Sequence, residues 1–279
     1  MNKLHTMAWA MLAIGLLAVG ADVPATFAQG KADLNKLSME VNALQMLTNL
    51  GLTGDQYKAL VKLAKEVSPK ATKREAAKGS DKMRGILTDL RLTLAKGEFD
   101  KTDKLLAELD TVYEKEKPKL DDFVEISDTG RRRASDVLKM LTARQVADYL
   151  TIYPEDLDDP VDLVMATIDE GVKLKGQAWT DLRDSVVEEV CWKLAGTDII
   201  QTKKATERLN FLFDKAHALG AAELMKQRAN VEAAFKQTCA VAGPTEQMKN
   251  LMEHRLAELL SNPELGTALG TLGKHAKFD

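Results

Sequence analysis

Apolar residues recur every three or four positions along most of the chain. The first such stripe consists of Leu34, Leu37, Val41, Leu44 and Leu47, and a second consists of Met83, Leu87, Leu90 and Leu94. This spacing places each set on one face of a helix, and Gly51 and Gly97 end the two patterns. No segment alternates apolar and polar residues with a period of two over a convincing length. The pattern therefore predicts an all-α fold.

A short pattern, Leu-Thr-x-x-Gln, begins two of the predicted helices. Its copies comprise Leu52, Thr53 and Gln56, and then Leu141, Thr142 and Gln145. The threonine hydroxyl can accept a hydrogen bond from the backbone N–H three residues later, while the glutamine side chain reaches back to the threonine N–H. This arrangement is a capping box, so we predict that helices start directly after both threonines.

Two weaker similarities indicate an internal duplication. Residues 52–60 can be laid over residues 174–182, and residues 137–145 over residues 256–264, at offsets of 174 − 52 = 122 and 260 − 141 = 119 positions. In the second match, Ser261 and Glu264 occupy capping-box positions. Two matches at nearly one offset predict two tandem, degenerately repeated helical hairpin or bundle units. We place these units at 33–153 and 160–279.

The predicted linker, residues 154–160, combines prolines with a cluster of acids. Its carboxylates could bind calcium, but the spacing of an EF-hand is absent. Asp159 as N-cap, Pro160 at the first helical position and Asp162 in the first turn account for most of the acids. We therefore interpret this segment as a linker that leads into a charged helix start.

The first 28 residues have the pattern of a cleaved secretory signal peptide. Lys3 precedes an apolar run of about 15 residues, which is shorter than the roughly 20 that a membrane-spanning helix needs. We expect cleavage after Ala28, with a second candidate site at residues 19–21. The resulting protein is expected to be exported or periplasmic, soluble and not membrane-spanning. In an oxidising compartment, Cys191 and Cys239 could form a disulfide or remain two buried thiols.

Composition and motifs narrow the functional classes. The chain has 39 Lys and Arg residues against 42 Asp and Glu residues, so its near-neutral balance gives no reason to expect a nucleic acid partner. The aromatic content of 5% suits helices better than sheets. Common catalytic motifs are absent, so we expect no enzyme. Asp214 and His217 have helical ligand spacing but lack a second such pair, so we also expect no metal and no cofactor.

The export signal, the helical pattern and the two capping boxes together resemble the Spy/CpxP-like LTxxQ family of bacterial periplasmic proteins. The resemblance rests on the six box residues and covers the first half of the chain. It implies long helical hairpins that dimerise into curved cradles. It also implies a role like that of the family members, which include ATP-independent chaperones, envelope-stress modulators and metal-responsive sensors.

From these observations we expect a non-enzymatic protein that binds other proteins through an apolar groove between helices. Its partners would be unfolded clients or envelope-stress components, and it would act as a chaperone or stress adaptor, as a monomer or a homodimer. The alternative is a periplasmic sensor module that binds a metal or another small ligand. An enzyme would instead need a polar pocket in which titratable groups converge.

Overall fold

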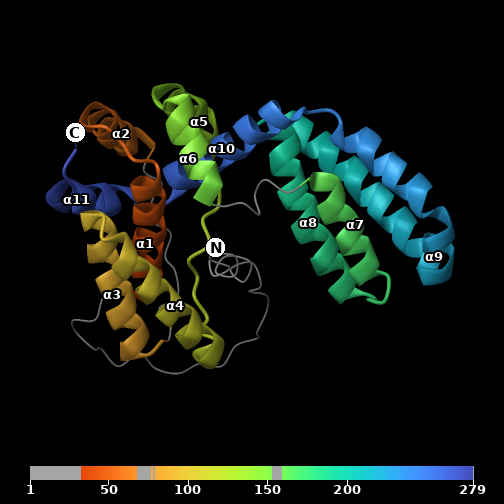
Figure 1. The fold of residues 1–279 in the computed structure, drawn as a ribbon, viewed down its shortest axis with the longest axis horizontal. Helices are drawn as coiled ribbons and strands as arrows, with labels where there is room; N and C mark the ends of the chain where they lie inside the picture. Colours follow the sequence, from red (N-terminus) through yellow and green to blue (C-terminus); the bar gives the residue numbers. More distant parts are fainter. Residues whose placement is uncertain (1–32, 68–76, 78, 153–158, 279) are drawn as a thin grey trace. The chain divides into compact units, whose positions relative to one another are not determined.

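The computed structural model describes residues 33–67, 77, 79–152 and 159–278. The predicted signal peptide and residues 154–158 of the predicted linker lie outside this range. Within it, the chain forms eleven helices and no β-strand, so the predicted all-α class is confirmed (Figure 1). Among these helices, none combines the length and the apolar character that crossing a membrane requires.

The chain divides into two compact units. Unit 1 comprises Met1–Gly130 and Glu258–Asp279, and unit 2 comprises Arg131–Ala257. The boundaries fall inside two helices, α5 (Asp128–Met140) and α10 (Pro244–Ser261). Unit 2 is therefore an insertion within the sequence of unit 1, whereas the sequence predicted consecutive units.

Unit 1 contains five complete helices. They are α1 (Leu34–Asn49), α2 (Gly54–Val67), α3 (Asp81–Lys96), α4 (Phe99–Glu116) and α11 (Leu265–His275). Helix α1 packs against α3 and α11, while α3 also packs against α4. The two predicted apolar stripes lie on α1 and α3, and all of their residues are buried. Their burial explains why both segments show a single apolar face.

The ends of α3 follow from local chemistry. The Ser80 side chain accepts a hydrogen bond from the backbone N–H of Met83 at 3.0 Å, which caps the helix start. Gly97 stands at the C-cap with φ of 70°, a left-handed conformation that glycine adopts without steric cost. The predicted end of this stripe at Gly97 is therefore confirmed.

Helix α11 comes from the far end of the sequence and packs against α1, α2 and α3. Its buried face consists of Leu265, Ala268, Leu269 and Leu272. The buried Glu40 carboxylate on α1 accepts a hydrogen bond from the Thr271 hydroxyl at 2.7 Å and lies 3.5 Å from a guanidinium nitrogen of Arg91 on α3. This packing differs from the predicted division into 33–153 and 160–279, because the apolar face of α11 is buried against helices of the first segment.

Tyr57 on α2 contacts the C-terminal segment through a hydrogen bond and a ring stack. Its hydroxyl donates to the Leu269 carbonyl oxygen at 3.0 Å, and its ring stacks on Phe278 with the centroids 4.4 Å apart. A Cβ atom at Gly273 would overlap the Tyr57 hydroxyl and lie 2.9 Å from the ring carbon that bears it. Glycine at this position therefore permits the close approach of α11 to the tyrosine.

We predict that Gly273→Ala lowers the free energy of unfolding by about 1–2 kcal/mol relative to Gly270→Ala, because it disturbs a hydrogen bond and a ring stack. Gly270 is the matched control, since it lies on the same helix and a Cβ there would meet nothing within 4 Å. Equilibrium urea denaturation followed by circular dichroism measures both variants. Equal stabilities would show that Tyr57 does not constrain position 273.

Unit 2 contains four complete helices, of which α7, α8 and α9 share one hydrophobic core. They are α6 (Ala143–Ile152), α7 (Pro160–Gly171), α8 (Gln177–Ala195) and α9 (Ile199–Cys239). Helix α9 packs against α7 and α8. As predicted, Asp159 caps α7 by accepting a hydrogen bond from the Val161 N–H at 2.8 Å, and Pro160 occupies the first turn.

Helix α9 reverses its direction at Gly220. This residue has φ of 69° and ψ of 166°, which is not a helical conformation. Phe213 and Phe235 lie 22 positions apart and would be about 33 Å apart on a continuous helix, yet their ring centroids are 5.2 Å apart. Residues 199–219 and residues 221–239 therefore form two limbs that lie side by side (Figure 1). We call them the first and the second limb of α9.

We predict that Gly220→Ala lowers the free energy of unfolding by about 1–3 kcal/mol, because residues with a side chain rarely adopt this backbone conformation. The matched control is Gly85→Ala on an exposed turn of α3, where a Cβ meets nothing within 4 Å. There, removing glycine from a helix interior should stabilise by about 0.5–1 kcal/mol. Urea denaturation decides between the two signs, and a stabilising Gly220→Ala would contradict a required reversal.

Candidate functional site

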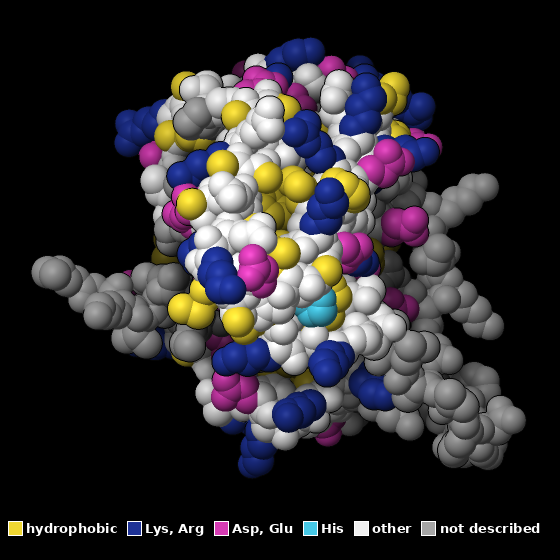
Figure 2. All heavy atoms as spheres, turned by 90° about the vertical axis from the view of Figure 1, so that its right-hand side faces the viewer, with side chains coloured by type: hydrophobic (Ala, Val, Ile, Leu, Met, Phe, Trp, Pro, Cys, Tyr) yellow, Lys and Arg dark blue, Asp and Glu magenta, His cyan; other side chains and the backbone are white. Residues whose placement is uncertain are grey.

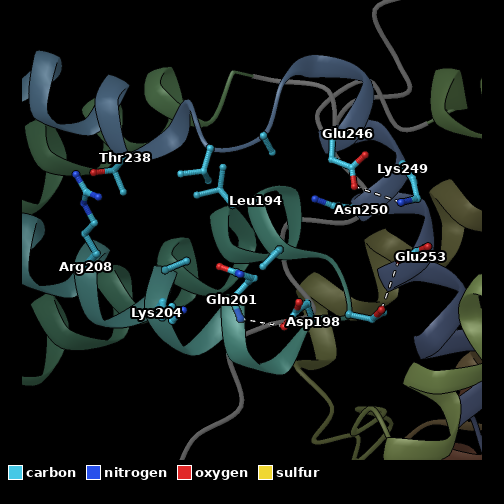
Figure 3. A pocket seen from close by; sticks show the side chains of 15 residues that line it. Leu194, Asp198, Gln201, Lys204, Arg208, Thr238, Glu246, Lys249, Asn250 and Glu253 are labelled. Atoms are coloured by element: carbon cyan, nitrogen blue, oxygen red, sulfur yellow. Dashed lines mark hydrogen bonds and ion pairs between the residues drawn. The ribbon is translucent and has the colours of Figure 1, made fainter.

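A groove of about 770 Å³ lies in unit 2, where the end of α8, both limbs of α9 and the start of α10 meet (Figure 3). Leu194 and Ala195 from α8, Ala205 from the first limb, and Ala242 after the second limb provide its apolar lining. The reversal at Gly220 is what brings the two limbs of α9 to the same groove. The site is thus assembled from segments that are far apart in the sequence.

The end of α8 and the start of α10 are held together by a buried amide. Asn250 donates a hydrogen bond from its side chain to the Lys193 carbonyl oxygen at 3.1 Å. Gly196, with φ of 53°, lies against it, because a Cβ at this glycine would come within 3.1 Å of three Asn250 atoms. Asn250 therefore fixes one wall of the groove against the other.

The carboxylates of the groove already have partners within the protein. Asp198 accepts hydrogen bonds from two backbone N–H groups at 2.9 and 3.0 Å and caps the start of α9. Glu246 forms an ion pair with Lys249 at 3.2 Å, and Glu253 accepts a hydrogen bond from the Thr197 hydroxyl at 3.5 Å. These groups contribute to the structure of the rim.

Two cations of the groove, unlike its carboxylates, have no partner among the described residues. Lys204 and Arg208 stand one turn apart on the first limb, both exposed (Figure 3). Neither forms a hydrogen bond or an ion pair with any other described residue. These two cations are therefore available to a partner, although the groove lining holds three cations, with Lys249, and three carboxylates in all.

Large apolar side chains are exposed on and beside the helices that form the groove. Val241 lines it and is 69% exposed, while Ile199 and Ile200 are 58% and 67% exposed beside the lining residues of α9. Met248, next to Lys249, is 39% exposed. Val241 thus gives the groove an exposed apolar contact, whereas Ile199, Ile200 and Met248 belong to the same helices but do not line it.

Two tryptophans of unit 2 each stack on a histidine. Trp192 stacks on His254 with ring centroids 3.9 Å apart, and Trp179 stacks on His217 at 4.2 Å. His217 also forms a hydrogen bond with the Leu174 carbonyl oxygen at 3.0 Å. Both histidine rings therefore pack within unit 2.

The buried imidazole of His254 is electrostatically unusual. Burial, together with the positive charges of Arg255 and Arg131, lowers the pKa of His254 to about 3. The unfolded chain, with a histidine pKa near 6.5, consequently binds a proton more readily than the folded protein between these two values. The free energy of unfolding must therefore decrease as the pH falls below about 6.5.

Both predicted LTxxQ capping boxes have their two hydrogen bonds. The Thr53 N–H donates to the Gln56 side chain at 2.9 Å, and the Gln56 N–H donates back to the threonine hydroxyl at 3.4 Å. The corresponding distances for Thr142 and Gln145 are 2.9 and 3.2 Å. The first box lies in unit 1 and the second in unit 2. Leu52 and Leu141 directly precede the two boxes.

The predicted capping box at Ser261 and Glu264 does not form. Ser261 is the last residue of α10, and its hydroxyl accepts a hydrogen bond from the Ser127 N–H at 2.9 Å. The Glu264 N–H donates instead to the Asn262 side chain at 2.8 Å. Pro263 explains the difference, because it disfavours helical continuation at the preceding residue and moves the break beyond Ser261.

Cys191 and Cys239 are free, buried thiols in the core of unit 2. Cys191 lies 3.3 Å from the Thr206 hydroxyl. Burial is the main cause that raises the pKa of Cys239 to about 11, so this thiol carries little thiolate at neutral pH. Neither cysteine therefore has the environment of an activated nucleophile.

Asp214 and His217, the candidate ligand pair, both contact other side chains of unit 2. The Asp214 carboxylate accepts a hydrogen bond from Arg183 at 2.7 Å, while His217 stacks on Trp179. In the part of the chain that the structure describes, no group of three or more His, Cys, Asp or Glu residues is arranged to hold a metal ion. Comparison of the chain with protein-family models, curated proteins and solved structures gave no match.

Between pH 8 and pH 5 the free energy of unfolding of the unaltered protein should decrease because His254 resists protonation in the folded state. We predict that this decrease is smaller by about 2 kcal/mol in His254→Gln, because glutamine does not titrate. Urea denaturation at both pH values, followed by the fluorescence of Trp179 and Trp192, reports directly on unit 2. An unchanged pH dependence in the variant would show that His254 titrates normally in the folded protein.

Proposed function

We propose that this chain is a non-enzymatic helical protein that binds segments of other proteins, in the manner of a chaperone or an envelope-stress adaptor. The observation that carries the proposal is the groove of unit 2, together with exposed apolar side chains in it and at the start of α9. Val241 lines the groove, and Val241, Ile199 and Ile200 are each more than half exposed, although the exposure of apolar side chains of this size to water is unfavourable. Binding a partner would bury this area.

The structure of the rim supports protein binding more than catalysis. The three groove carboxylates have internal partners, so no titratable acid is left unpaired as a general acid or base. Apolar side chains mixed with polar groups are typical of surfaces that bind proteins. The fold therefore supplies a preformed, amphipathic groove.

We place this activity in an exported protein on the basis of residues 1–28 and of the resemblance to the Spy/CpxP-like LTxxQ family. The two formed capping boxes are compatible with that resemblance, although such boxes also occur in other helical proteins. The apolar segment that follows Lys3 supports export.

A small organic ligand is the second candidate for the same groove. Its volume of about 770 Å³ lies in the range of small-molecule sites, which extends over roughly 300–1,000 Å³. A sensor of this kind would gain stability that rises with the logarithm of the ratio of ligand concentration to Kd. Thermal denaturation in the presence of a small-molecule collection separates this activity from client binding.

We predict that Val241→Asp reduces the ability of the full chain to suppress aggregation of an unfolding client protein by about threefold or more, because it charges the apolar rim. Met225→Asp is the matched control, since Met225 is 81% exposed on the second limb and does not line the groove. Light scattering of heated citrate synthase measures both variants. Equal activities of the two variants, or no suppression by the unaltered chain, would reject the groove as the client site.

A further inference from the structure

The first limb of α9 carries an exposed stripe that begins at the groove. It consists of Ile200, Lys204, Arg208, Phe211 and Lys215. At 100° per residue, these five positions fall within an arc of about 80° over a length of about 22 Å. Ile200 and Phe211 are 67% and 56% exposed. We call these five residues the α9 stripe.

The opposite face of the same limb is fixed in the core. Leu209, Phe213 and Ala216 are buried there, at angles of about 120–180° from the centre of the stripe. The exposure of the α9 stripe is thus a consequence of how the limb packs. Figure 2 views the molecule from the side on which α9 lies and shows exposed apolar side chains among Lys and Arg and several Asp and Glu side chains.

The cations of the stripe differ from those toward the C-terminal end of α9. Toward the C-terminal end of the helix, Arg228, Lys226 and Lys236 each pair with a carboxylate. None of the three cations of the stripe has a carboxylate partner among the described residues, and Lys215 instead lies over the Phe211 ring at 4.4 Å. Glu207 lies about 20° outside this arc, and no acid of the first limb falls within it. The stripe therefore keeps a net positive charge beside two exposed apolar anchors.

We infer that the α9 stripe binds an acidic amphipathic helix of a partner protein. Such a helix can place apolar residues on Ile200 and Phe211, carboxylates between them on Lys204 and Arg208, and a further carboxylate on Lys215, one turn beyond Phe211. Bidentate pairing of a carboxylate with Arg208 would fix the register of the partner helix. The inference rests on the proposed protein-binding function and assigns the chemical class of the bound segment.

An anionic membrane fits the same face less well. The limb cannot insert, because its opposite side is held in the core, and the stripe offers only two large apolar residues. The exposed carboxylates of Asp198 and Glu246 lie at the groove beside Lys204 and Arg208. They would repel a uniformly negative surface, whereas a helix can place its carboxylates on the cations alone.

The test uses fluorescein-labelled helical peptides with leucine at i, i+4, i+7 and i+11. One carries glutamate at the flanking positions and the other lysine, and fluorescence anisotropy measures their binding to the full chain. We expect the glutamate peptide to bind about tenfold more tightly at low salt, and the difference to shrink at high salt. Phe211→Ala should weaken its binding by about tenfold, while Met225→Ala changes it by less than about twofold.

Two neighbouring lysines provide a matched pair. Lys204→Glu should weaken binding of the glutamate peptide by about fivefold. Lys203 lies outside the arc, so Lys203→Glu should weaken this binding by less than about twofold. Both substitutions change the net charge equally, and circular dichroism verifies the fold.

The outcomes separate this inference from the proposed function. Equal binding of the two peptides, or equal effects of Lys204→Glu and Lys203→Glu, would overturn the acidic-helix assignment even if clients are still protected from aggregation. Tighter, Lys204-dependent binding to phosphatidylserine vesicles or to a single-stranded oligonucleotide would also overturn it. Absence of both peptide binding and client protection would instead reject protein binding itself.

Discussion

The reversal of α9 at Gly220 is the constraint on which unit 2 and its groove depend. A continuous helix of 41 residues would extend about 60 Å, far beyond the helices it packs against. Because glycine tolerates φ of 69° with ψ of 166°, the second limb returns alongside the first and places Phe235 against Phe213. The same fold-back brings Thr238 and Val241 to the groove lined by Lys204 and Arg208. One backbone conformation thus produces both a core and a surface site.

Unit 1 depends on a different kind of long-range contact. Its C-terminal helix α11 buries an apolar face against helices that precede unit 2 in the chain. The buried Glu40 carboxylate contacts Thr271 and Arg91, so α1, α3 and α11 meet around one polar group. A buried carboxylate without such partners would be costly. The position of α11 is therefore defined by polar contacts as well as by apolar burial.

Local rules predicted the features that depend on neighbours in the sequence. The stripes of α1 and α3, the N-cap at Asp159 and the helix end at Gly97 each depend on residues within one or two turns. The location of α11 and the fold-back at Gly220 depend on packing between distant residues, which periodicity does not encode. Gly220 also stands within a segment rich in alanine and leucine, where helix propensity conceals a break. At Ser261 the spacing of a capping box was present, but Pro263 places the helix break after Ser261, so Ser261 ends α10 and does not cap a following helix.

The candidate site was predictable only in part for the same reason. An apolar groove was expected, whereas ten of the fifteen residues that line the observed groove are polar or charged, and they come from segments that meet through tertiary packing. The α9 stripe itself is visible in the sequence once the buried face of the limb is known, since Leu209 and Phe213 lie opposite Ile200 and Phe211. Without that reference, apolar residues on both sides of the limb give no single amphipathic face.

The cations of the α9 stripe also bear on self-association. Two copies that met through this stripe in a symmetric pair would bring Lys204, Arg208 and Lys215 of both chains together, with one Glu207 from each to offset them. Like charges brought together at an interface cost several kcal/mol. The exposed Ile200 and Phe211 are therefore protected from pairing with themselves by the charges that surround them. An oppositely charged helix meets no such barrier, so the same residues that disfavour a homodimer at this surface favour a selected partner.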